Sequence, residues 1–337
     1  MLHQCENANQ DIVNHYQSGK GAVMDKKLII GLSACLAGEK VRFDGGHRKD
    51  ATLLEEMGKC FEFRTFCPEV AIGMSTPREP IRLVTSSAGI QAVGTRDNRY
   101  NVTEPLKQIT AKQKAWLQTL SGYVVKKGSP SCGMERVKVY SENRGSPTGM
   151  GLFTEQLIQL FPLLPVEEEG RLKNPVLLDS FIQRIYAYHR WNELDKSGIT
   201  AHKLINFHMQ YKMILLSRCQ KIYRELGRLI ATVTRDNISV IAKQYINILM
   251  ETLKKPATRG GHFNVLQHLF GFLKNHLPYE EKQQLLYTTE KYRIGELPLI
   301  APLILLNMYF TRHKHRFIEN TLYLKPYPIE LGIYKKL

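Results

Sequence analysis

A change in hydrophobic pattern near residue 165 constrains the fold of this 337-residue chain more than any other feature. Before it, short apolar runs alternate with amphipathic segments and with turns rich in glycine or proline, which indicates strands joined by helices. After it, apolar residues recur at steps of three and four, the period of a helix that buries one face. The sequence therefore predicts an open, mostly parallel α/β sheet followed by an all-α part.

The same pattern gives the expected boundaries. We expect a loose extension over residues 1–26, an α/β domain over 27–162, a linker with an acidic run over 163–173, and an all-α domain over 174–337. In the α/β domain, strands are expected at residues 28–33, 61–66, 122–126 and 137–140, and helices at 52–59 and 103–119. In the all-α domain, helical periodicity covers residues 178–194, 201–232, 236–253, 263–276, 279–293 and 298–312.

The charge of the chain points to a polyanionic partner. There are 47 lysines and arginines against 31 aspartates and glutamates, and of the net +16, residues 1–165 carry +5 and the remainder +11. Nucleic acid is the polyanion that such a surface most often meets in a cytoplasm, with a plain solubility surface as the alternative. Candidate nucleic-acid contacts are a basic row opposite the apolar stripe of residues 201–232 and one arginine before a later helix: Arg218, Lys221, Arg224, Arg228 and Arg259. A solvated helix face and an ordinary helix cap are the alternatives for them.

The sequence argues against a membrane. No apolar run reaches the roughly 18 to 20 residues needed to cross a bilayer. The first 26 residues contain Glu6, Asp11 and Asp25, where a secretory signal needs an apolar core. We therefore expect a cytoplasmic protein, in which disulfides are rare.

Three of the six cysteines share one context. Cys35, Cys67 and Cys132 each follow the carboxyl end of an expected strand, in a turn rich in small residues or proline. In an open α/β sheet these ends converge on one crevice. Three converging thiols suit an iron–sulfur cluster or zinc with one open position, and buried or redox cysteines are the alternative. Cys5, Cys60 and Cys219 lack this context and are expected to be structural.

Several motifs carry a resemblance to known families. The segments IGLSACL (30–36), VRFDGGH (41–47), CPE (67–69) and KGSPSCG (127–133) together resemble the thiouracil desulfurase family over roughly residues 27–160. The segments RGGHFNVLQHLFG (259–271), PLIAP (298–302) and YLKPYP (323–328) resemble the YbgA-type helical domain. The fusion of the two resembles enzymes that remove sulfur from 4-thiouridine in tRNA.

The resemblance implies a [4Fe–4S] cluster held by the three cysteines, with its fourth iron open to the thiocarbonyl sulfur. It also implies Glu69 as the acid–base residue and Ser129 as the residue that orients water or the base, because a base and a proton donor are needed to replace sulfur by oxygen. Spacing leaves open whether Ser129 or Ser131 faces the substrate, and the family motif favours Ser129. Ser131 and His47 are further candidate substrate contacts, with a turn-capping serine and an exposed turn histidine as the alternatives.

The expected activity is removal of sulfur from a thiolated uracil, with 4-thiouridine in tRNA as substrate and uridine and sulfide as products. Two alternatives stay open. The chain could act on free thiouracil or thiolated nucleosides. It could also be a non-catalytic iron–sulfur protein that binds RNA or senses redox state.

Overall fold

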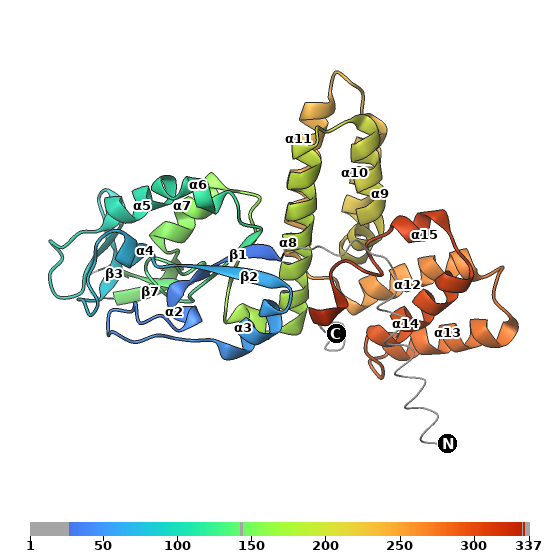
Figure 1. The fold of residues 1–337 in the computed structure, drawn as a ribbon, viewed down its shortest axis with the longest axis horizontal. Coiled ribbons are helices and arrows are strands. Elements are labelled where there is room, and N and C mark those ends of the chain that lie inside the picture. Colours follow the sequence, from blue (N-terminus) through green and yellow to red (C-terminus); the bar gives the residue numbers. More distant parts are fainter. Residues whose placement is uncertain (1–26, 142–143, 332, 334–337) are drawn as a thin grey trace.

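The structure, a computed structural model, describes residues 27–141, 144–331 and 333. Figure 1 shows the α/β part on the left, long upright helices in the middle and shorter helices on the right. The expected fold class, a mostly parallel α/β part followed by helices, is confirmed. The expected extension over residues 1–26, Cys5 included, lies outside the described residues.

The main sheet consists of parallel strands in the order β2-β1-β5-β8. Its strands are β1 Leu28–Ser33, β2 Phe61–Phe66, β5 Gly122–Val125 and β8 Val166–Glu168. Strand β1 is an uninterrupted apolar run because helices cover both faces of the sheet. Helix α8 (Pro175–Lys196) packs on one face, where Ile182 and Ile185 meet Ile30 and Leu32. On the other face, Tyr123 meets Phe153 of helix α7.

Strand β8 lies inside the segment that the sequence predicts to be a linker. Its acidic residues are buried: Glu167 and Glu168 are 4% and 1% exposed. Glu167 accepts hydrogen bonds from Arg171 and Arg184 at 2.6 and 2.9 Å. Buried carboxylates need such partners. Residues 166–168 therefore form an edge strand of the sheet with ion-paired carboxylates, where the sequence predicts a linker.

A second sheet, with the order β4-β3-β6-β7, was predicted only at one strand. Its two antiparallel hairpins join through a parallel pair between β3 and β6. The strands are β3 Ile81–Ser86, β4 Gly89–Gly94, β6 Val137–Ser141 and β7 Arg144–Gly149. Strands β4 and β7 are rich in glycine and in exposed residues, so they lack the apolar pattern that identifies a strand.

Helices of the α/β part connect these strands. They are α2 Ala34–Ala37, α3 Ala51–Gly58, α4 Pro68–Ala71, α5 Thr103–Lys112, α6 Lys114–Leu117 and α7 Leu152–Leu160. The single helix expected over residues 103–119 is therefore two helices, separated at Gln113. The Oε1 of Gln113 accepts a hydrogen bond from the indole N–H of Trp116 at 2.6 Å, which holds this turn.

The second part is helical and is built around α8. Its further elements are α9 Ala201–Arg218, α10 Gln220–Ala231, α11 Ile238–Lys254, α12 Arg259–Leu273, α13 Tyr279–Arg293, α14 Ile300–Arg312, α15 Arg316–Asn320 and the short 3₁₀ turns Arg171–Lys173 and Ile329–Leu331. The segment 201–232, expected to be one amphipathic stretch, is broken at Cys219, whose backbone is extended (φ −158°, ψ 108°). No described helix is both long and apolar enough to cross a membrane.

Candidate active site

Three cysteines line one cavity of about 360 Å³ at the carboxyl ends of β1, β2 and β5. Cys35 lies in the first turn of α2, directly after β1, and Cys67 lies between β2 and α4. Cys132 lies in the loop after β5. Because the three strands are parallel neighbours, residues far apart in the sequence reach the same end of the sheet.

Burial controls the chemistry of these thiols. Burial, and then the neighbouring Cys67, raise the pKa of Cys35 to about 11. Burial is also the largest cause that raises the pKa of Cys67 and, more strongly, that of Cys132. The three thiols therefore stay protonated unless a positively charged partner binds beside the sulfur atoms.

The donor set suits an iron–sulfur cluster. Cysteine thiolates are the usual protein ligands of such clusters, and three of these soft donors line one cavity.

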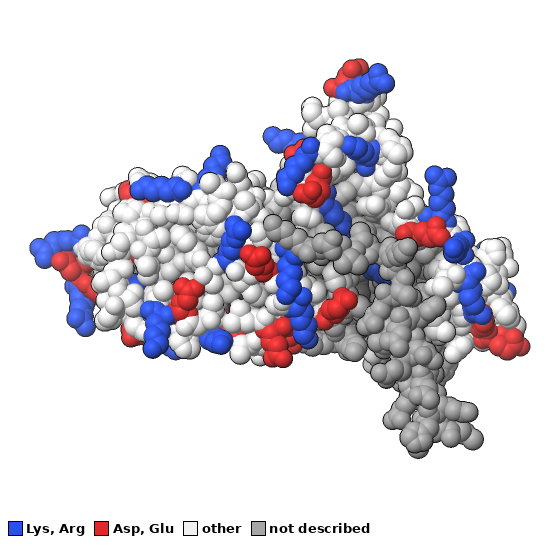
Figure 2. Space-filling model, in the orientation of Figure 1, with Lys and Arg blue, Asp and Glu red and all other residues white. Residues whose placement is uncertain are grey.

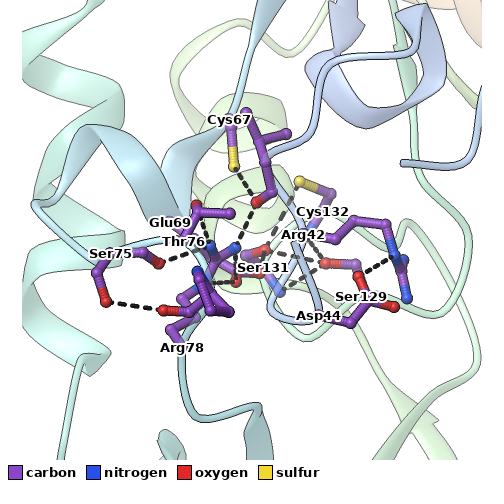
Figure 3. A network of polar contacts seen from close by, with 12 residues as sticks. Arg42, Asp44, Cys67, Glu69, Ser75, Thr76, Arg78, Ser129, Ser131 and Cys132 are labelled. Atoms are coloured by element: carbon purple, nitrogen blue, oxygen red, sulfur yellow. Dashed lines mark hydrogen bonds and ion pairs between the residues drawn. The ribbon is translucent and has the colours of Figure 1, made fainter. Parts of the chain in front are cut away.

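Glu69 lies in the wall of the same cavity and is held from both sides (Figure 3). Its Oε2 accepts hydrogen bonds from Nε and Nη2 of Arg78 at 3.0 and 2.6 Å. Its Oε1 accepts a hydrogen bond from the hydroxyl of Ser131 at 2.6 Å. The side chains of Arg78 and Glu69 are 5% and 14% exposed, so the ion pair is shielded from water and fixes the carboxylate.

The two candidate serines have different partners. Ser131 contacts Glu69, whereas Ser129 reaches it only through Ser131, with 2.9 Å between the two Oγ atoms. Ser129 Oγ also accepts hydrogen bonds from the backbone N–H groups of Ser131 and Cys132, at 3.3 and 3.1 Å. Ser129 thus holds the turn that carries Cys132, and Ser131 is the serine beside the carboxylate.

Arg78 was not predicted from the sequence. It also donates hydrogen bonds to the backbone oxygens of Val41 and Ser75, at 2.8 and 3.1 Å, so it ties Glu69 to two loops. The residue has no periodic pattern around it and lies between Pro77 and Pro80. The signal that could have found it is chemical: a carboxylate in a cavity wall needs a positive partner.

Other candidates lie elsewhere. His47 is exposed and does not line the cavity; its Nδ1 accepts a hydrogen bond from the backbone N–H of Lys49 at 3.2 Å. Cys60 and Cys219 do not line the cavity either. Arg42, Arg48, Lys126 and Lys127, by contrast, give the cavity a positive lining that was not predicted from the sequence.

The expected basic row is only partly present. Lys221, Arg224 and Arg228 are exposed on α10. Arg218, however, ends α9 and turns inward, where its Nη2 donates a hydrogen bond to Gln183 at 2.9 Å and its Nη1 donates to the backbone oxygen of Lys255. It does not continue the row, because the helix breaks at Cys219.

Arg259 is likewise engaged within the protein. Its guanidinium donates to the backbone oxygen of Tyr292 at 2.5 Å and lies 4.9 Å from the centre of the Tyr292 ring. On the face shown in Figure 2, basic and acidic side chains are interspersed over both parts and form no single basic patch.

Both parts of the chain are similar to known proteins. Residues 30–169 match the 2-thiouracil desulfurase family, and residues 212–328 match DUF1722, a family of proteins of unknown function. The uncharacterized protein YbgA of Escherichia coli (strain K12) is 32% identical over 151 residues, which are 44% of this chain and 89% of YbgA. The uncharacterized protein YbbK of Bacillus subtilis (strain 168) is 32% identical over 111 residues, which are 30% of this chain and 71% of YbbK.

Among solved structures, the [4Fe-4S]-dependent thiouracil desulfidase TudS is 30% identical, with a TM-score of 0.36, and the match covers 44% of this chain and 94% of that chain. Over residues 30–169 the chain therefore belongs to the 2-thiouracil desulfurase family, and its C-terminal region, over residues 212–328, belongs to DUF1722.

Proposed function

We propose that the chain is a [4Fe–4S]-dependent desulfurase that removes sulfur from 4-thiouridine in tRNA and leaves uridine and sulfide. The observation that carries the proposal is that three thiols and the Glu69–Ser131 pair line one cavity. Membership of the 2-thiouracil desulfurase family supports a thiolated uracil as the reacting group. Cys35, Cys67 and Cys132 are the residues that would hold the cluster.

The residues around the cavity suit a hydrolytic exchange of sulfur for oxygen. When bound, the cluster supplies a Lewis acid that polarises the carbon–sulfur bond. Attacking water must lose a proton, and the departing sulfur must gain one. Glu69 takes up the proton of water at Oε1, since Arg78 occupies Oε2. Ser131, whose hydroxyl contacts that oxygen, passes the proton on to the leaving group, and Ser129 orients the Ser131 hydroxyl.

The tRNA part of the proposal is supported by charge. Arg48 and Lys127 are exposed residues that line the cavity, and Lys221, Arg224 and Arg228 are exposed on α10. Such groups bind phosphates of a nucleic acid in addition to the reacting base. A free base carries no phosphate and gains nothing from them. A thiolated base in folded tRNA would first have to leave its stack.

Replacement of the cysteines tests the cluster. After anaerobic reconstitution, the wild-type protein should bind about four irons per chain, as a [4Fe–4S] cluster requires. Single changes of Cys35, Cys67 or Cys132 to Ala should remove iron, visible absorbance and desulfuration together. Cys60→Ala and Cys219→Ala are the matched controls and should keep all three. A colourless wild-type protein that binds zinc would contradict the proposal.

Substrate comparison tests the rest of the proposal. The holoenzyme should release sulfide from thiolated tRNA faster than from free thiouracil or 4-thiouridine at equal concentration. Turnover of the free compounds alone would favour the small-molecule alternative. A stable cluster without turnover of any of the three would favour the non-catalytic iron–sulfur protein.

A further inference from the structure

Three consecutive glutamates are buried where strand β8 ends. Glu167 and Glu168 are the last residues of the strand and Glu169 follows it, and all three are shielded from water. Glutamate is rarely buried without a partner, because its carboxylate loses the hydration that it has in water. Glu167 is paired with Arg171 and Arg184. Glu168 and Glu169 bind a single loop instead, and that loop carries one of the three candidate cluster ligands.

Glu168 holds this loop, residues 126–136 between β5 and β6, shortly after Cys132. Its Oε1 accepts hydrogen bonds from the backbone N–H groups of Met134 and Glu135, at 2.9 and 3.3 Å. Hydrogen bonds to a charged oxygen are stronger than those between neutral groups. A side chain of the sheet's edge strand therefore sets the position of the chain beyond the cysteine.

Glu169 holds the same loop at its beginning. Its Oε2 accepts a hydrogen bond from the backbone N–H of Lys127 at 2.7 Å, and its Oε1 forms an ion pair with the Nζ of Lys126. The backbone N–H of Lys126 in turn donates to the hydroxyl of Ser33 in β1 at 3.0 Å. The two carboxylates thus fix the loop on either side of Cys132.

This third ligand needs such support more than the other two. Cys35 and Cys67 lie close to the ends of β1 and β2, where the hydrogen bonds of the sheet fix the backbone. Cys132 lies farther from its strand, within the loop. Thr154 of helix α7 donates a hydrogen bond to the backbone oxygen of Cys132 at 2.6 Å. The loop is therefore held by α7 from one element and by the two glutamates of the β8 end from another.

We propose that Glu168 and Glu169 are positioning residues that hold Cys132 where its sulfur can bind the cluster together with Cys35 and Cys67. This inference rests on the proposed function, because it needs a cluster in the cavity. Groups outside the ligand set that fix the orientation of a metal ligand commonly affect both metal retention and activity. Neither glutamate lines the cavity, so both act through the loop.

Iron retention in the holoenzyme tests this inference. Glu168→Met roughly keeps the length of the side chain and removes the acceptor, so the loop loses two hydrogen bonds. Iron release to excess chelator, under anaerobic and native conditions, should become about tenfold faster, which corresponds to about 1.4 kcal/mol. Glu168→Gln keeps an oxygen that can accept both hydrogen bonds and should release iron at nearly the wild-type rate.

A spectroscopic measurement separates positioning from a general loss of stability. The electron paramagnetic resonance spectrum of the reduced cluster depends on the geometry of its ligands, so Glu168→Met should change it and Glu168→Gln should not. Asp179→Asn is the matched control. It removes the charge of another buried carboxylate, whose partners Gln183 and Tyr327 lie outside the loop. This control should keep the wild-type rate of iron release and the wild-type spectrum.

The other end of the loop provides a second arm. Glu169→Met should also speed iron release and change the spectrum. If neither Met variant folds, Lys126→Met decides, since it breaks the ion pair with Glu169 from the loop side. Wild-type iron release and spectra in these variants, or the same changes in Asp179→Asn, would overturn the inference. A wild-type protein that assembles no cluster overturns the proposed function and this inference together, whereas a cluster that is insensitive to the variants overturns this inference alone.

Discussion

Glu69 is positioned by groups from two other segments of the chain. Arg78 holds one carboxylate oxygen and Ser131 the other, while Cys67, two residues earlier, turns into the same cavity. Each contact is short and shielded, so the carboxylate has one orientation. A group that exchanges protons with a reacting molecule gains from such a fixed geometry, because no reorganisation is needed during the reaction.

Glu69→Gln should keep the cluster and lose turnover. The amide has the shape of the carboxylate but cannot take up a proton, and general acid–base groups contribute about 10²- to 10⁴-fold. Cluster absorbance and the rate of sulfide release, measured anaerobically, separate the two effects. Ser131→Ala should lower the rate more than Ser129→Ala, since only Ser131 contacts Glu69. Glu62→Gln, at an exposed carboxylate on β2, is the control. Near-full activity of Glu69→Gln would remove this residue from the mechanism.

One buried and one partly buried histidine should make the fold sensitive to acid. Burial, followed by nearby positive charges, lowers the pKa of His262 to about 3 and that of His208 to about 4. An unfolded histidine has a pKa of about 6.5. Between these values the unfolded chain binds more protons, so the stability contributed by the neutral histidines is present above pH 6.5 and is lost as the pH falls towards the folded pKa values.

Urea unfolding between pH 7 and pH 4 measures this loss. Each histidine adds up to about 1.4 kcal/mol per pH unit to the slope of unfolding free energy. His208→Gln should reduce the slope by about one proton, whereas His202→Gln, at an exposed site, should not. Equal slopes in the wild type and His208→Gln would contradict the assignment.

At the scale of elements, the crossing of α9 and α12 depends on one glycine. A Cβ atom at Gly261 would lie 1.9 Å from the backbone oxygen of Ser217, and backbone cannot move aside as a side chain can. The RGGH motif at the start of α12 therefore serves helix packing. Thr258, which precedes the helix, accepts a hydrogen bond from the Gly261 N–H at 3.0 Å. Close packing of the two helices is therefore enough to explain the glycine at position 261, and no phosphate bound at the start of α12 is needed to explain it.

Gly261→Ala should destabilise the protein by about 1–3 kcal/mol or more, the usual cost of overpacking. Gly271 lies in the same helix with nothing within 4 Å of an added Cβ. Gly271→Ala should instead stabilise the protein by about 0.5–1 kcal/mol, because alanine favours a helix over glycine. Chemical denaturation of both variants provides the comparison. A destabilised Gly271→Ala with an unaffected Gly261→Ala would show that the helices cross differently.

The elements that the sequence predicted are those with a local signal. The uninterrupted apolar run of β1 is typical of a strand that is covered on both faces. Strand β8 could not be predicted, because its carboxylates are buried only by virtue of Arg171 and Arg184. Arg218 follows the spacing of the basic row, yet the break at Cys219 turns it inward.

In the candidate site, too, the residues with a local sequence signal were predictable, and those that depend on tertiary contacts were not. The three cysteines were predictable because each follows an apolar strand, and the sheet order then brings them together. The contact between Ser131 and Glu69 depends on how two loops meet, which spacing does not determine. The role of Arg78 became clear only once its burial and its ion pair with Glu69 were known.

At the scale of the whole molecule, helix α8 unites the two parts. One side of α8 packs Phe181 and Ile185 on the main sheet, and the other side packs Tyr188 and Trp191 against the helices that follow. Because this helix is buried on both sides, the helical part is joined to the α/β part by a shared core. A polyanion bound to the helices would therefore be held in a fixed relation to the cavity.

The salt dependence of tRNA binding tests whether helix α10 contacts the tRNA. Changing Lys221, Arg224 and Arg228 together to Gln removes three exposed positive charges from α10. If each contacts a phosphate, the slope of log binding constant against log salt should flatten by roughly 0.7–0.9 per residue, and the apparent KM for thiolated tRNA should rise. Turnover of free thiouracil, which carries no phosphate, should not change.

A second triple variant separates local contacts from net charge. Changing Lys59, Lys112 and Lys114 to Gln removes the same charge from exposed positions of the α/β part, none of which lines the cavity. It should leave most of the salt slope intact. The slope reflects the number of phosphates that the protein contacts, and charges far from the nucleic acid affect it little. Equal slopes for the wild type and the α10 variant would exclude that helix as a tRNA contact and direct attention to Arg48 and Lys127 at the cavity. If charge removal there also left the slope unchanged, tRNA would be excluded as the substrate, and the free thiolated base would take its place.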